Sequence, residues 1–422
     1  MTQNVLDFKM MHLSWPGGPL RGTAQLPASK SESNRALILR ALAGGGQLDN
    51  LSDAHDTQLM RRLLAAAPDR AELDAEDAGT VMRFLTAFLA VTGWRGRLTG
   101  TARMQQRPIA VLVAALRQLG AQIEYEGAEG FPPLRFGGFA PTATDVAPRL
   151  AVRGDISSQY ISALLLVAPL LPAGLLVQLT GSVGSWPYIS MTLDLMTRFG
   201  AETAVNPGGA LAIGPRPYRP ANYEVESDWS AASYWYALVA LGAPGSTVRL
   251  TGLRQKSSQG DQAIARLMAP LGVATTFLDQ DEVQLTQTAV RADQLTQVDF
   301  TDCPDLAQTV AVVAAALGQT LVLTGLESLR IKETDRIAAL QTELGKFGGT
   351  LLEIAPGHFQ VERVGAFEVS GQTIATYHDH RMAMAFAPLA LRGPLHIAAP
   401  EVVRKSYPQF WAELRKIGFS AV

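Results

Sequence analysis

An apolar strand pattern recurs along the chain, and each copy ends in a Leu-Thr-Gly-like signature. The clear copies are GRLTG, LVQLTG, TVRLTG and LVLTG, which end at Gly100, Gly181, Gly252 and Gly325. Looser copies are QLDNLSD and PLHIAAP, near Ser52 and Pro400. Short apolar runs bounded by glycine are typical of buried strands. The pattern therefore predicts a series of similar strands spread over the whole sequence.

An amphipathic helix that ends in glycine and leads into a short strand follows most of these copies. The endings are LRQLGAQIEY, MTRFGAETAV, LMAPLGVATTF, LGKFGGTLLEI and LRKIGFSAV. Glycine stops a helix because it readily adopts the left-handed conformation. Chance recurrence of LTG in a chain rich in alanine and leucine would explain the strands but not the matching helix ends. We therefore predict an α/β fold built from six copies of one helix-plus-sheet unit.

Basic side chains recur at the predicted helix starts, where the helix dipole disfavours them. In LPASKSESNRALILRALAGGG the apolar positions predict a helix that begins near Ser31 or Ser33 and stops at Gly44. Its positive end then carries Lys30 and Arg35, each unfavourable by roughly 0.3–1 kcal/mol unless an anion is also there. The same placement is predicted for Arg83, Arg107, Lys332, Arg336, Arg381 and Lys405. A single case is usually a solvated or salt-bridged residue, whereas several predict one anion-binding cleft for a ligand with more than one negative group.

Hydroxyl and amide side chains gather at two further predicted helix starts. They are Ser157, Ser158 and Gln159 in RGDISSQYISALLL, and Ser185 and Tyr188 in GSWPYISMTLDLM. N-capping explains one serine at each start. Two serines and a glutamine suit a phosphate or polyol cradle equally well, so both interpretations stay open.

Two carboxylates also lie at helix starts, Asp305 in CPDLAQTVAVVAAAL and Glu333 in KETDR. The helix dipole stabilises carboxylates there, so a structural role is the simpler explanation for either one alone. Glu333 nevertheless lies between Lys332 and Arg336, and each carboxylate begins a segment of the same repeat series. A carboxylate pair that faces a cationic pocket is suited to general acid–base catalysis.

Length and composition narrow the class of protein. The chain has 422 residues, more than one ordinary core accommodates, so two domains are expected. Contents of 47% hydrophobic and 18% charged residues indicate a soluble globular protein. The net charge of −2, without a basic block, argues against a general nucleic-acid binder. The single cysteine, Cys303, excludes a disulfide framework and fits a reducing cytoplasm.

The sequence predicts neither membrane insertion nor a cofactor. MTQNVLDFKMMHLSWPGG lacks the basic and apolar regions of a signal peptide. The most apolar run, ISALLLVAPLLPAGLLVQLTG, is broken by two prolines and a glycine and predicts a buried helix, a turn and a strand. Without a GxxxxGK[ST] loop, a GxGxxG after a strand, an HExxH or paired cysteines, neither a nucleotide cofactor nor a metal is expected. We expect His378 and His380 in YHDHRM to order the turn ahead of Arg381 rather than to ligate a metal.

Ten motifs run along the chain in a fixed order. They are LPASKSESNRAL, DAGTVMR, RMQQRPI, GDISSQYISALL, PYISMTL, SSQGD, PDLAQT, KETDRI, HDHRMAMAF and RKSYP. In this order they resemble the 3-phosphoshikimate 1-carboxyvinyltransferase, or EPSP synthase, family over nearly the full chain. The resemblance implies an inside-out α/β barrel fold of two domains with three repeats each. It assigns residues 28–226 to the first domain and residues 1–27 plus 227–422 to the second, with the active site in the cleft between them.

The resemblance also implies an enzyme of aromatic amino acid and chorismate biosynthesis that uses no cofactor. The family transfers the enolpyruvyl group of phosphoenolpyruvate to the 5-hydroxyl of shikimate 3-phosphate and releases phosphate. Asp305 would accept the hydroxyl proton, Glu333 would protonate the methylene carbon, and Lys30 would assist. The residues implied for shikimate 3-phosphate are Lys30, Ser31, Arg35, Ser157, Ser158, Gln159, Ser185, Tyr188, Asp305, Ser328 and Lys332. Those implied for phosphoenolpyruvate are Lys30, Gly79, Arg107, Gln159, Arg336, Arg381 and Lys405.

Three residues depart from the family's usual pattern. Asp77 replaces an asparagine, Phe84 replaces a proline, and Ser328 replaces an asparagine that usually helps bind the phosphate of shikimate 3-phosphate. An aspartate in place of an amide adds a possible anion beside the implied phosphoenolpyruvate site. We expect these changes to bear on substrate affinity more than on the type of reaction.

Two alternatives remain open. UDP-N-acetylglucosamine enolpyruvyl transferases share the fold and phosphoenolpyruvate, but typically begin with a Lys-Asn motif and carry a reactive Cys or Asp in a mobile loop. Here the start is Lys30-Ser31, and Cys303 is expected on a rigid helix start. A non-catalytic protein that binds phosphorylated ligands would have lost an acid–base group, yet Lys30, Asp305 and Glu333 are present. We further expect a cytoplasmic monomer that binds small molecules and neither nucleic acid nor membrane.

Overall fold

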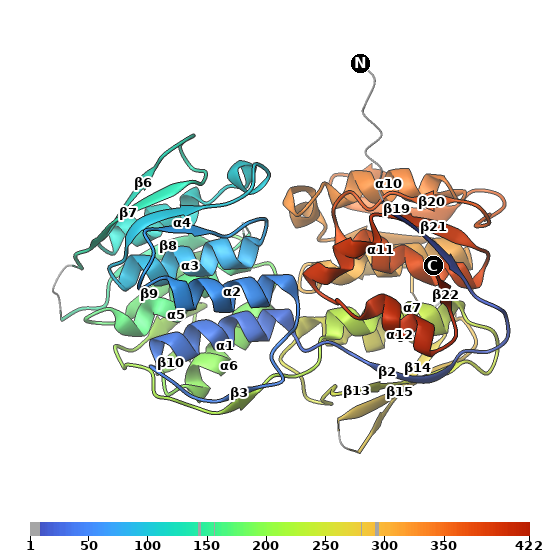
Figure 1. Ribbon diagram of the computed structural model, residues 1–422, viewed down its shortest axis with the longest axis horizontal. Helices are drawn as coiled ribbons and strands as arrows, with labels where there is room; N and C mark the ends of the chain where they lie inside the picture. Colours follow the sequence, from blue (N-terminus) through green and yellow to red (C-terminus); the bar gives the residue numbers. More distant parts are fainter. Residues whose placement is uncertain (1–8, 142–144, 156, 280, 292–294) are drawn as a thin grey trace. The chain divides into compact units, whose positions relative to one another are not determined.

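The computed structural model describes residues 9–141, 145–155, 157–279, 281–291 and 295–422. The chain divides into two compact units, one of residues 29–225 and one that joins residues 226–422 to the N-terminal segment up to residue 28 (Figure 1). We call these the middle unit and the terminal unit. The first eight residues of the N-terminal segment lie outside the described residues.

The middle unit encloses its core among helices. Its helices are α1 (Lys30–Leu42), α2 (His55–Ala66), α3 (Gly79–Val91), α4 (Ala110–Gln118), α5 (Ser158–Val167) and α6 (Trp186–Arg198), with 3-10 turns η1 (Met104–Gln106) and η2 (Ala168–Leu170). Helices α3 and α5 are buried along almost their whole length. A helix that is apolar on all sides belongs inside a core. The core therefore lies where α1, α3 and α5 contact one another, and the sheets lie outside it.

Two four-stranded sheets and one strand pair cover the middle unit. The first sheet has the order β4 (Glu72–Asp74), β5 (Arg95–Thr99), β7 (Leu134–Phe139), β6 (Ala121–Tyr125). The second has the order β10 (Thr203–Val205), β11 (Ala210–Ile213), β9 (Leu175–Thr180), β8 (Arg149–Arg153). The pair consists of β3 (Leu48–Asp49) and β12 (Tyr223–Glu224).

The terminal unit repeats this arrangement. Its α-helices are α7 (Trp229–Leu241), α8 (Ile264–Met268), α9 (Ala307–Leu317), α10 (Arg336–Gly345), α11 (His380–Phe386) and α12 (Phe410–Lys416). Its 3-10 turns are η3 (Gly260–Ala263), η5 (Pro304–Leu306), η6 (Glu327–Ile331), η7 (Ala387–Leu391) and η8 (Pro400–Lys405). Helices α7, α9 and α11 are buried nearly throughout and contact one another, so they form the centre of this core.

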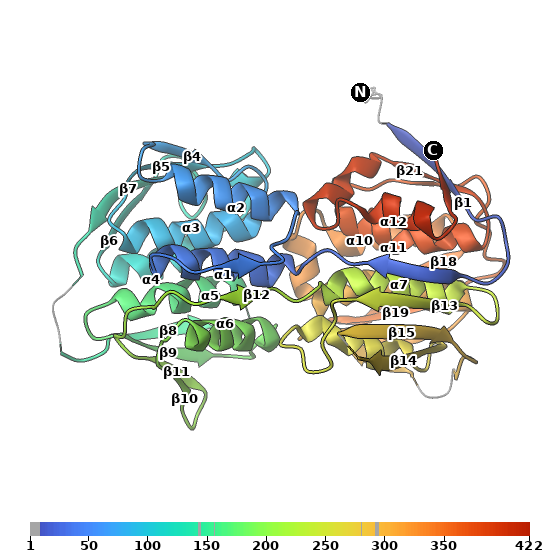
Figure 2. The same cartoon turned by 60° about the horizontal axis from the view of Figure 1, so that its bottom comes forward.

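Three four-stranded sheets belong to the terminal unit. The first has the order β14 (Val273–Leu278), β15 (Glu282–Gln287), β13 (Thr247–Thr251), β2 (Arg21–Gln25). The second has the order β16 (Gln297–Asp299), β17 (Leu321–Thr324), β19 (His358–Arg363), β18 (Gly349–Ala355). The third has the order β20 (Thr373–Ile374), β21 (Leu395–Ala398), β1 (Met10–Ser14), β22 (Ser420–Ala421). The N-terminal segment thus supplies one strand to each of two sheets, β2 beside β13 and β1 between β21 and β22 (Figure 2).

The predicted strand repeat is confirmed by strand pairing. Each clear LTG copy forms a strand, β5, β9, β13 or β17, that has one parallel and one antiparallel neighbour. The looser copy PLHIAAP forms β21 with the same two kinds of neighbour, β20 and β1. The other loose copy is reduced to the two-residue strand β3, which pairs with β12 in a two-stranded sheet.

The predicted helix stops are confirmed as well. Gly120, Gly200, Gly272, Gly348 and Gly418 follow α4, α6, α8, α10 and α12 with φ of 104°, 91°, 92°, 81° and 111°. These values lie in the region that only glycine enters readily. Each glycine therefore turns the chain from its helix towards the next strand, as the sequence pattern requires.

Some cations predicted for the first turn of a helix lie elsewhere. Arg35 and Arg83 are the sixth and fifth residues of α1 and α3, beyond the first turn. Arg107 lies between η1 and α4, and Lys405 ends η8. Helix assignment from apolar spacing fixes the buried face but leaves the first residue uncertain by several positions.

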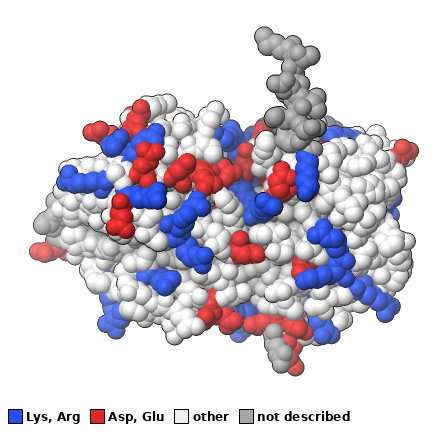
Figure 3. Space-filling model, in the orientation of Figure 1, with Lys and Arg blue, Asp and Glu red and all other residues white. Residues whose placement is uncertain are grey.

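None of the helices in the described ranges is long and apolar enough to span a bilayer. The most apolar run forms α5, η2 and β9, the predicted helix, turn and strand. On the face seen in Figure 3, basic and acidic side chains are interspersed.

Candidate active site

Arg35 is buried in the middle unit and bound to neutral groups. Its Nε donates to Thr192 Oγ1 at 2.7 Å, and its Nη2 donates to Ser162 Oγ at 3.1 Å and to the Tyr188 carbonyl at 3.2 Å. Its Nη1 donates to the Ser31 carbonyl at 2.9 Å. Burial lowers the pKa of Arg35 to about 10, so the guanidinium stays cationic at neutral pH. These contacts bring together three residues predicted for shikimate 3-phosphate, from α1 and α6.

Aromatic rings complete the surroundings of this cation. The Arg35 guanidinium carbon lies 5.3 Å from the centre of the Phe84 ring and 5.8 Å from that of Tyr188. Cation–π contacts strengthen when the pair is removed from water, and Phe84 is only 1% exposed. One of the three departures from the family's pattern therefore touches a predicted substrate residue directly.

Gly79, the first residue of α3, lies against two guanidinium groups. A Cβ atom at this position would be 2.8 Å from Arg107 Nη1 and 2.9 Å from Arg83 Nη1. Arg83 Nη1 donates to Gln159 Oε1 at 2.5 Å, and Gln159 Nε2 donates to Thr80 Oγ1 at 3.1 Å. The structure thus gathers Gly79, Arg107 and Gln159, all predicted for phosphoenolpyruvate, and adds Arg83 to them.

The serines differ in how their hydroxyls are used. Ser157 caps α5, because its Oγ accepts a hydrogen bond from the Gln159 amide at 3.3 Å, which confirms the capping interpretation for that residue. Ser158 follows it and is buried. Ser185 precedes α6 with φ of 58°, and its side chain makes no capping hydrogen bond. Capping therefore does not explain the hydroxyl of Ser185.

Lys30 is the first residue of α1 and forms an ion pair that the sequence did not reveal. Its Nζ lies 3.2 Å from Asp56 Oδ2, and Asp56 is 2% exposed at the start of α2. This buried carboxylate balances the cation that the α1 dipole disfavours. The two residues are 26 positions apart, so only the packing of α1 on α2 brings them together.

Arg336 connects three carboxylates in the terminal unit. Its Nε donates to Asp379 Oδ2 at 2.7 Å, its Nη1 to Asp305 Oδ1 at 2.9 Å, and its Nη2 to Glu333 Oε2 at 3.0 Å. The guanidinium side chain is 2% exposed. Burial alone would lower the pKa of Arg336, but the charges of Asp379, Glu333 and Asp305 outweigh it and raise the pKa above its ordinary value. The predicted acid–base pair is therefore bridged by one fixed cation.

Asp305 lies among three cations. Besides Arg336, its Oδ2 is 2.8 Å from Arg381 Nη2 and its Oδ1 is 4.0 Å from Lys332 Nζ. Burial favours the protonated acid, but the charges of Arg381, Lys332 and Arg336 prevail and hold the pKa of Asp305 well below its usual range. Arg381 also donates to the Tyr234 hydroxyl at 3.3 Å, which anchors the guanidinium to α7.

Glu333 has a second cation near it. Its Oε1 lies 3.8 Å from Lys405 Nζ, so Glu333 stands between Lys405 and Arg336. Ser328, also predicted for shikimate 3-phosphate, lies in η6, one turn before Lys332 along the chain. Hence the terminal-unit residues that the sequence predicted for phosphoenolpyruvate, Arg336, Arg381 and Lys405, all contact one of the two predicted acid–base carboxylates.

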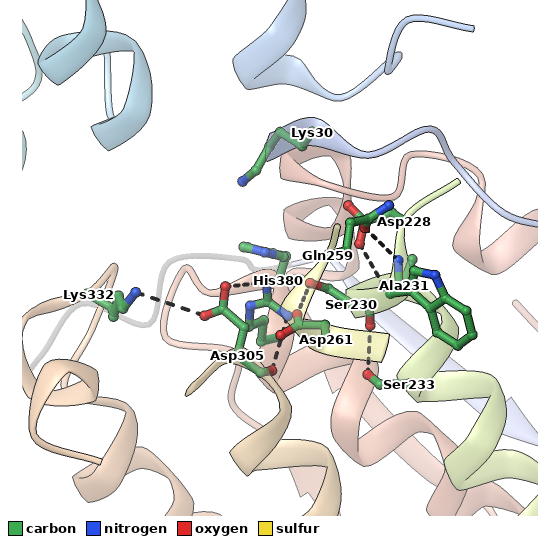
Figure 4. A network of polar contacts seen from close by, with 12 residues as sticks. Lys30, Asp228, Ser230, Ala231, Ser233, Gln259, Asp261, Asp305, Lys332 and His380 are labelled. Carbon is green, nitrogen blue, oxygen red and sulfur yellow. Dashed lines mark hydrogen bonds and ion pairs between the residues drawn. The ribbon is translucent and has the colours of Figure 1, made fainter. Parts of the chain in front are cut away.

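Two buried aspartates at this centre were missed. Asp379 is fully buried, caps α11 through the Arg381 amide at 2.9 Å, and pairs with Arg336. Asp261 accepts a hydrogen bond from Ser230 close to Asp305 (Figure 4). Burial, and then the charge of Asp305, raises the pKa of Asp261 to about 7. Asp379 lies in HDHRMAMAF and Asp261 lies in SSQGD, both quoted above, so an acidic residue inside a quoted motif was the available signal.

The described residues contain no group of three or more His, Cys, Asp or Glu side chains that could hold a metal ion. The chemistry available at this centre is instead that of fixed cations beside two carboxylates. Such an arrangement can bind phosphate and carboxylate groups and can exchange protons with a ligand.

Comparisons with known proteins agree on one family. The family model described as EPSP synthase (3-phosphoshikimate 1-carboxyvinyltransferase) matches residues 64–414. A 3-phosphoshikimate 1-carboxyvinyltransferase from Bacteroides fragilis (strain YCH46) is 47% identical over 412 residues, covering 97% of this chain and 98% of the relative. One from Burkholderia vietnamiensis is 39% identical, covering 94% and 96%.

Solved structures share the fold at lower identity. The structure of EPSP synthase from Acinetobacter baumannii matches with a TM-score of 0.76 and 22% identity, covering 98% of this chain and 100% of that one. The enolpyruvyl transferase NikO from Streptomyces tendae matches with a TM-score of 0.71 and 16% identity, covering 98% and 99%. These likenesses identify the two-domain α/β architecture.

Proposed function

This chain belongs to the EPSP synthase family, the 3-phosphoshikimate 1-carboxyvinyltransferases, and from that premise we propose how its side chains perform the family's reaction. The enzyme transfers the enolpyruvyl group of phosphoenolpyruvate to the 5-hydroxyl of shikimate 3-phosphate and releases phosphate. Both substrates carry a phosphate and a carboxylate. We therefore expect cations that are fixed before the substrates arrive among the side chains that bind them.

Each unit holds cations that we propose for phosphoenolpyruvate. The middle unit offers Arg107 beside Gly79, and Arg83 is available there too. The terminal unit offers Arg336, Arg381 and Lys405. The absence of a Cβ at Gly79 supports this assignment, because it leaves the two nearby guanidinium groups accessible to a small anion.

For shikimate 3-phosphate we propose residues of α1, α5 and α6 in the middle unit and, in the terminal unit, residues of η6 and directly after it. The hydroxyl of Ser185, which makes no capping bond, supports a role in holding the phosphate or a hydroxyl of the substrate. Ser31, Ser157, Ser158, Gln159 and Tyr188 complete the set from the middle unit. Ser328 and Lys332 are the proposed contacts from the terminal unit. Arg35 would set the positive potential of this site from its buried position.

The proton transfers follow from the two carboxylates. Asp305 would take the proton of the attacking 5-hydroxyl as oxygen bonds to C2 of phosphoenolpyruvate, while Glu333 gives a proton to C3. Lys30 would assist at the oxygen. In the second step the C3 proton returns to Glu333 and Asp305 gives its proton to the departing phosphate. The double bond is restored, and both side chains regain their starting protonation states. Binding of phosphoenolpyruvate would recruit Arg336 and Arg381 and so release Asp305 to act as a base.

The observation that carries the proposal is the bridging of Asp305 and Glu333 by Arg336, with Arg381 and Lys405 on either side. The test is phosphate release from phosphoenolpyruvate, which we expect only when shikimate 3-phosphate is added. Release with UDP-N-acetylglucosamine instead would favour the sister enzyme. Release with neither acceptor would favour a binding protein.

The position of Cys303 speaks against the sister enzyme. The thiol is 4% exposed at the start of η5, and burial raises its pKa above the ordinary value. A buried protonated thiol is a poor nucleophile. We further propose that the enzyme acts as a monomer in the cytoplasm, which a sedimentation measurement and cell fractionation would test.

A further inference from the structure

One face of α10 carries two polar side chains that contact the same downstream segment. Arg336 and Glu343 are seven residues apart, which is two helical turns, so they lie on the same side of the helix. Arg336 contacts Asp379, as described above. Glu343 is fully buried. Its hydrogen bonds go to Lys346, Ala375 and Tyr377 rather than to the cations around Asp305.

Glu343 binds the segment just before Asp379. Its Oε2 accepts hydrogen bonds from the Ala375 amide at 3.1 Å and from Lys346 Nζ at 2.6 Å. Its Oε1 accepts a hydrogen bond from the Tyr377 hydroxyl at 2.8 Å. Lys346 Nζ also donates to the Thr373 carbonyl at 2.8 Å. One buried carboxylate thus fixes residues 373–377 by both backbone and side chain.

The segment that Glu343 holds ends at the first of two consecutive left-handed residues. Tyr377 and His378 have φ of 53° and 57°. This conformation is uncommon outside glycine, and a bulky side chain adopts it only where the surroundings determine it. The turn is closed by the Asp379 amide, which donates to the Thr376 carbonyl at 2.8 Å. Directly after it stand Asp379 and, two residues on, Arg381.

We propose that Glu343 is a positioning residue that keeps the strained Tyr377–His378 turn in place and thereby fixes Asp379 and Arg381 for the substrate. Two side chains of α10 contact the chain on either side of the turn. Glu343 binds Ala375 and Tyr377, and Arg336 binds Asp379, so the helix fixes both ends of the turn. The inference rests on the proposed role of Arg381 in binding phosphoenolpyruvate. Glu343 itself touches neither predicted acid–base carboxylate in any contact described here, so it would act through the turn.

The chain offers a matched control in α12. Glu413 is also buried, accepts Lys416 Nζ three residues on, and accepts the Gln25 amide at 3.0 Å. Among the described residues, none from Gln25 to Ser29 has a positive φ. Glu413→Gln therefore removes the same kind of buried Glu–Lys pair and backbone contact without releasing a left-handed turn.

The test uses the full chain and five variants. Glu343→Gln removes the negative charge that pairs with Lys346 and leaves one acceptor oxygen where the carboxylate offers two. We therefore expect the KM for phosphoenolpyruvate to rise about tenfold with kcat changed less than about threefold. Amide hydrogen exchange at Ala375 and Tyr377 should accelerate. Glu413→Gln should lower the unfolding temperature comparably but leave that KM within about twofold. Tyr377→Phe, which removes the hydroxyl that donates to Glu343 Oε1 but leaves the carboxylate in place, should raise KM by a smaller factor and remains informative if Glu343→Gln does not fold.

A second substitution distinguishes a positioning role of Glu343 from general destabilisation of the protein. Glycine adopts the left-handed conformation without strain. Adding His378→Gly to Glu343→Gln should therefore return the KM at least about threefold towards the wild-type value. An unchanged KM in Glu343→Gln, an equal rise in Glu413→Gln, or no rescue by His378→Gly would overturn the inference. Arg381→Ala, measured in parallel, distinguishes failure of the proposed role of Glu343 from failure of the proposed role of Arg381. If Arg381→Ala leaves the KM for phosphoenolpyruvate unchanged, it is the role of Arg381 that fails.

Discussion

The Nε atom of Arg336 lies 2.7 Å from Asp379 Oδ2, and both side chains are almost completely buried. A charge-assisted hydrogen bond in such surroundings is among the stronger polar contacts in a protein. Asp379 also caps α11 through the Arg381 amide. One carboxylate therefore fixes two of the three terminal-unit cations proposed for phosphoenolpyruvate.

Asp379→Asn is expected to weaken both folding and substrate binding. Loss of the charged acceptor should lower the free energy of unfolding by roughly 1.5–3 kcal/mol, the usual range for a hydrogen bond to a charged group. The KM for phosphoenolpyruvate should rise, because Arg336 and Arg381 lose their common anchor. Urea unfolding and initial-rate kinetics measure the two effects. A stable variant with unchanged KM would show that Asp305 and Glu333 suffice to hold Arg336.

Phe84→Leu tests the ring beneath Arg35. The substitution keeps an apolar side chain in the interior of α3 but removes the π face, which lies 5.3 Å from the guanidinium carbon. We expect weaker binding of shikimate 3-phosphate by roughly 2- to 30-fold, equivalent to a cation–π contact of about 0.5–2 kcal/mol. Phosphoenolpyruvate binding should change less. Calorimetric titration with each substrate separates these effects, and equal weakening of both would point to a general shift of α3.

Gly79→Ala tests the close approach at the start of α3. The added Cβ would stand 2.8 Å from Arg107 Nη1, so the guanidinium groups must move. The hydrogen bond from Arg83 to Gln159 limits how far the Arg83 guanidinium can move. We expect a higher KM for phosphoenolpyruvate with a smaller change in kcat. If steady-state kinetics show wild-type values for both, the arginines do not contact the substrate in the orientation described here.

The sequence predicted the repeat well because its signals are local. The left-handed turn after α4 or α10 requires only a glycine at that position, and the apolar runs of β5 and β9 are short and end next to glycine. Local conformational preference and burial decide such features, and both can be read from a short window. The reduction of the QLDNLSD copy to β3 could not be read in the same way, because strand length depends on what lies alongside.

The part of the candidate site that the sequence predicted also rests on local signals. Cations and carboxylates inside the motifs were found, but their partners were not. Lys30 with Asp56, Arg35 with Phe84, and Arg336 with Asp379 join residues that are 26, 49 and 43 positions apart. Such pairs are created by helix packing, which no single segment encodes. Asp379 and Asp261 were nevertheless detectable, since each lies inside a motif already singled out.

Asp305 should make stability depend on pH in a defined direction. Its pKa is depressed in the folded protein, where Arg381, Lys332 and Arg336 outweigh the effect of burial. The stabilisation is therefore complete above the unfolded pKa of about 3.9 and is lost as pH falls through the lower folded pKa. Asp305→Asn should remove this dependence, which thermal unfolding between about pH 5 and pH 2 would measure. If the unfolding temperatures of the wild-type protein and of Asp305→Asn change with pH in parallel, the ion pairs of Asp305 do not contribute to stability as described.

The most direct measurement compares Glu333→Gln with Arg381→Ala, taking kcat and the dissociation constant of phosphoenolpyruvate for each variant. Glutamine keeps the shape of Glu333 but cannot donate the titratable proton, so kcat should fall by roughly 10²- to 10⁴-fold while binding changes little. Arg381→Ala should mainly weaken binding, because a charge-assisted contact is lost. Reversed effects, with Glu333→Gln impairing binding and Arg381→Ala impairing only kcat, would contradict the roles assigned to the carboxylates and the cations.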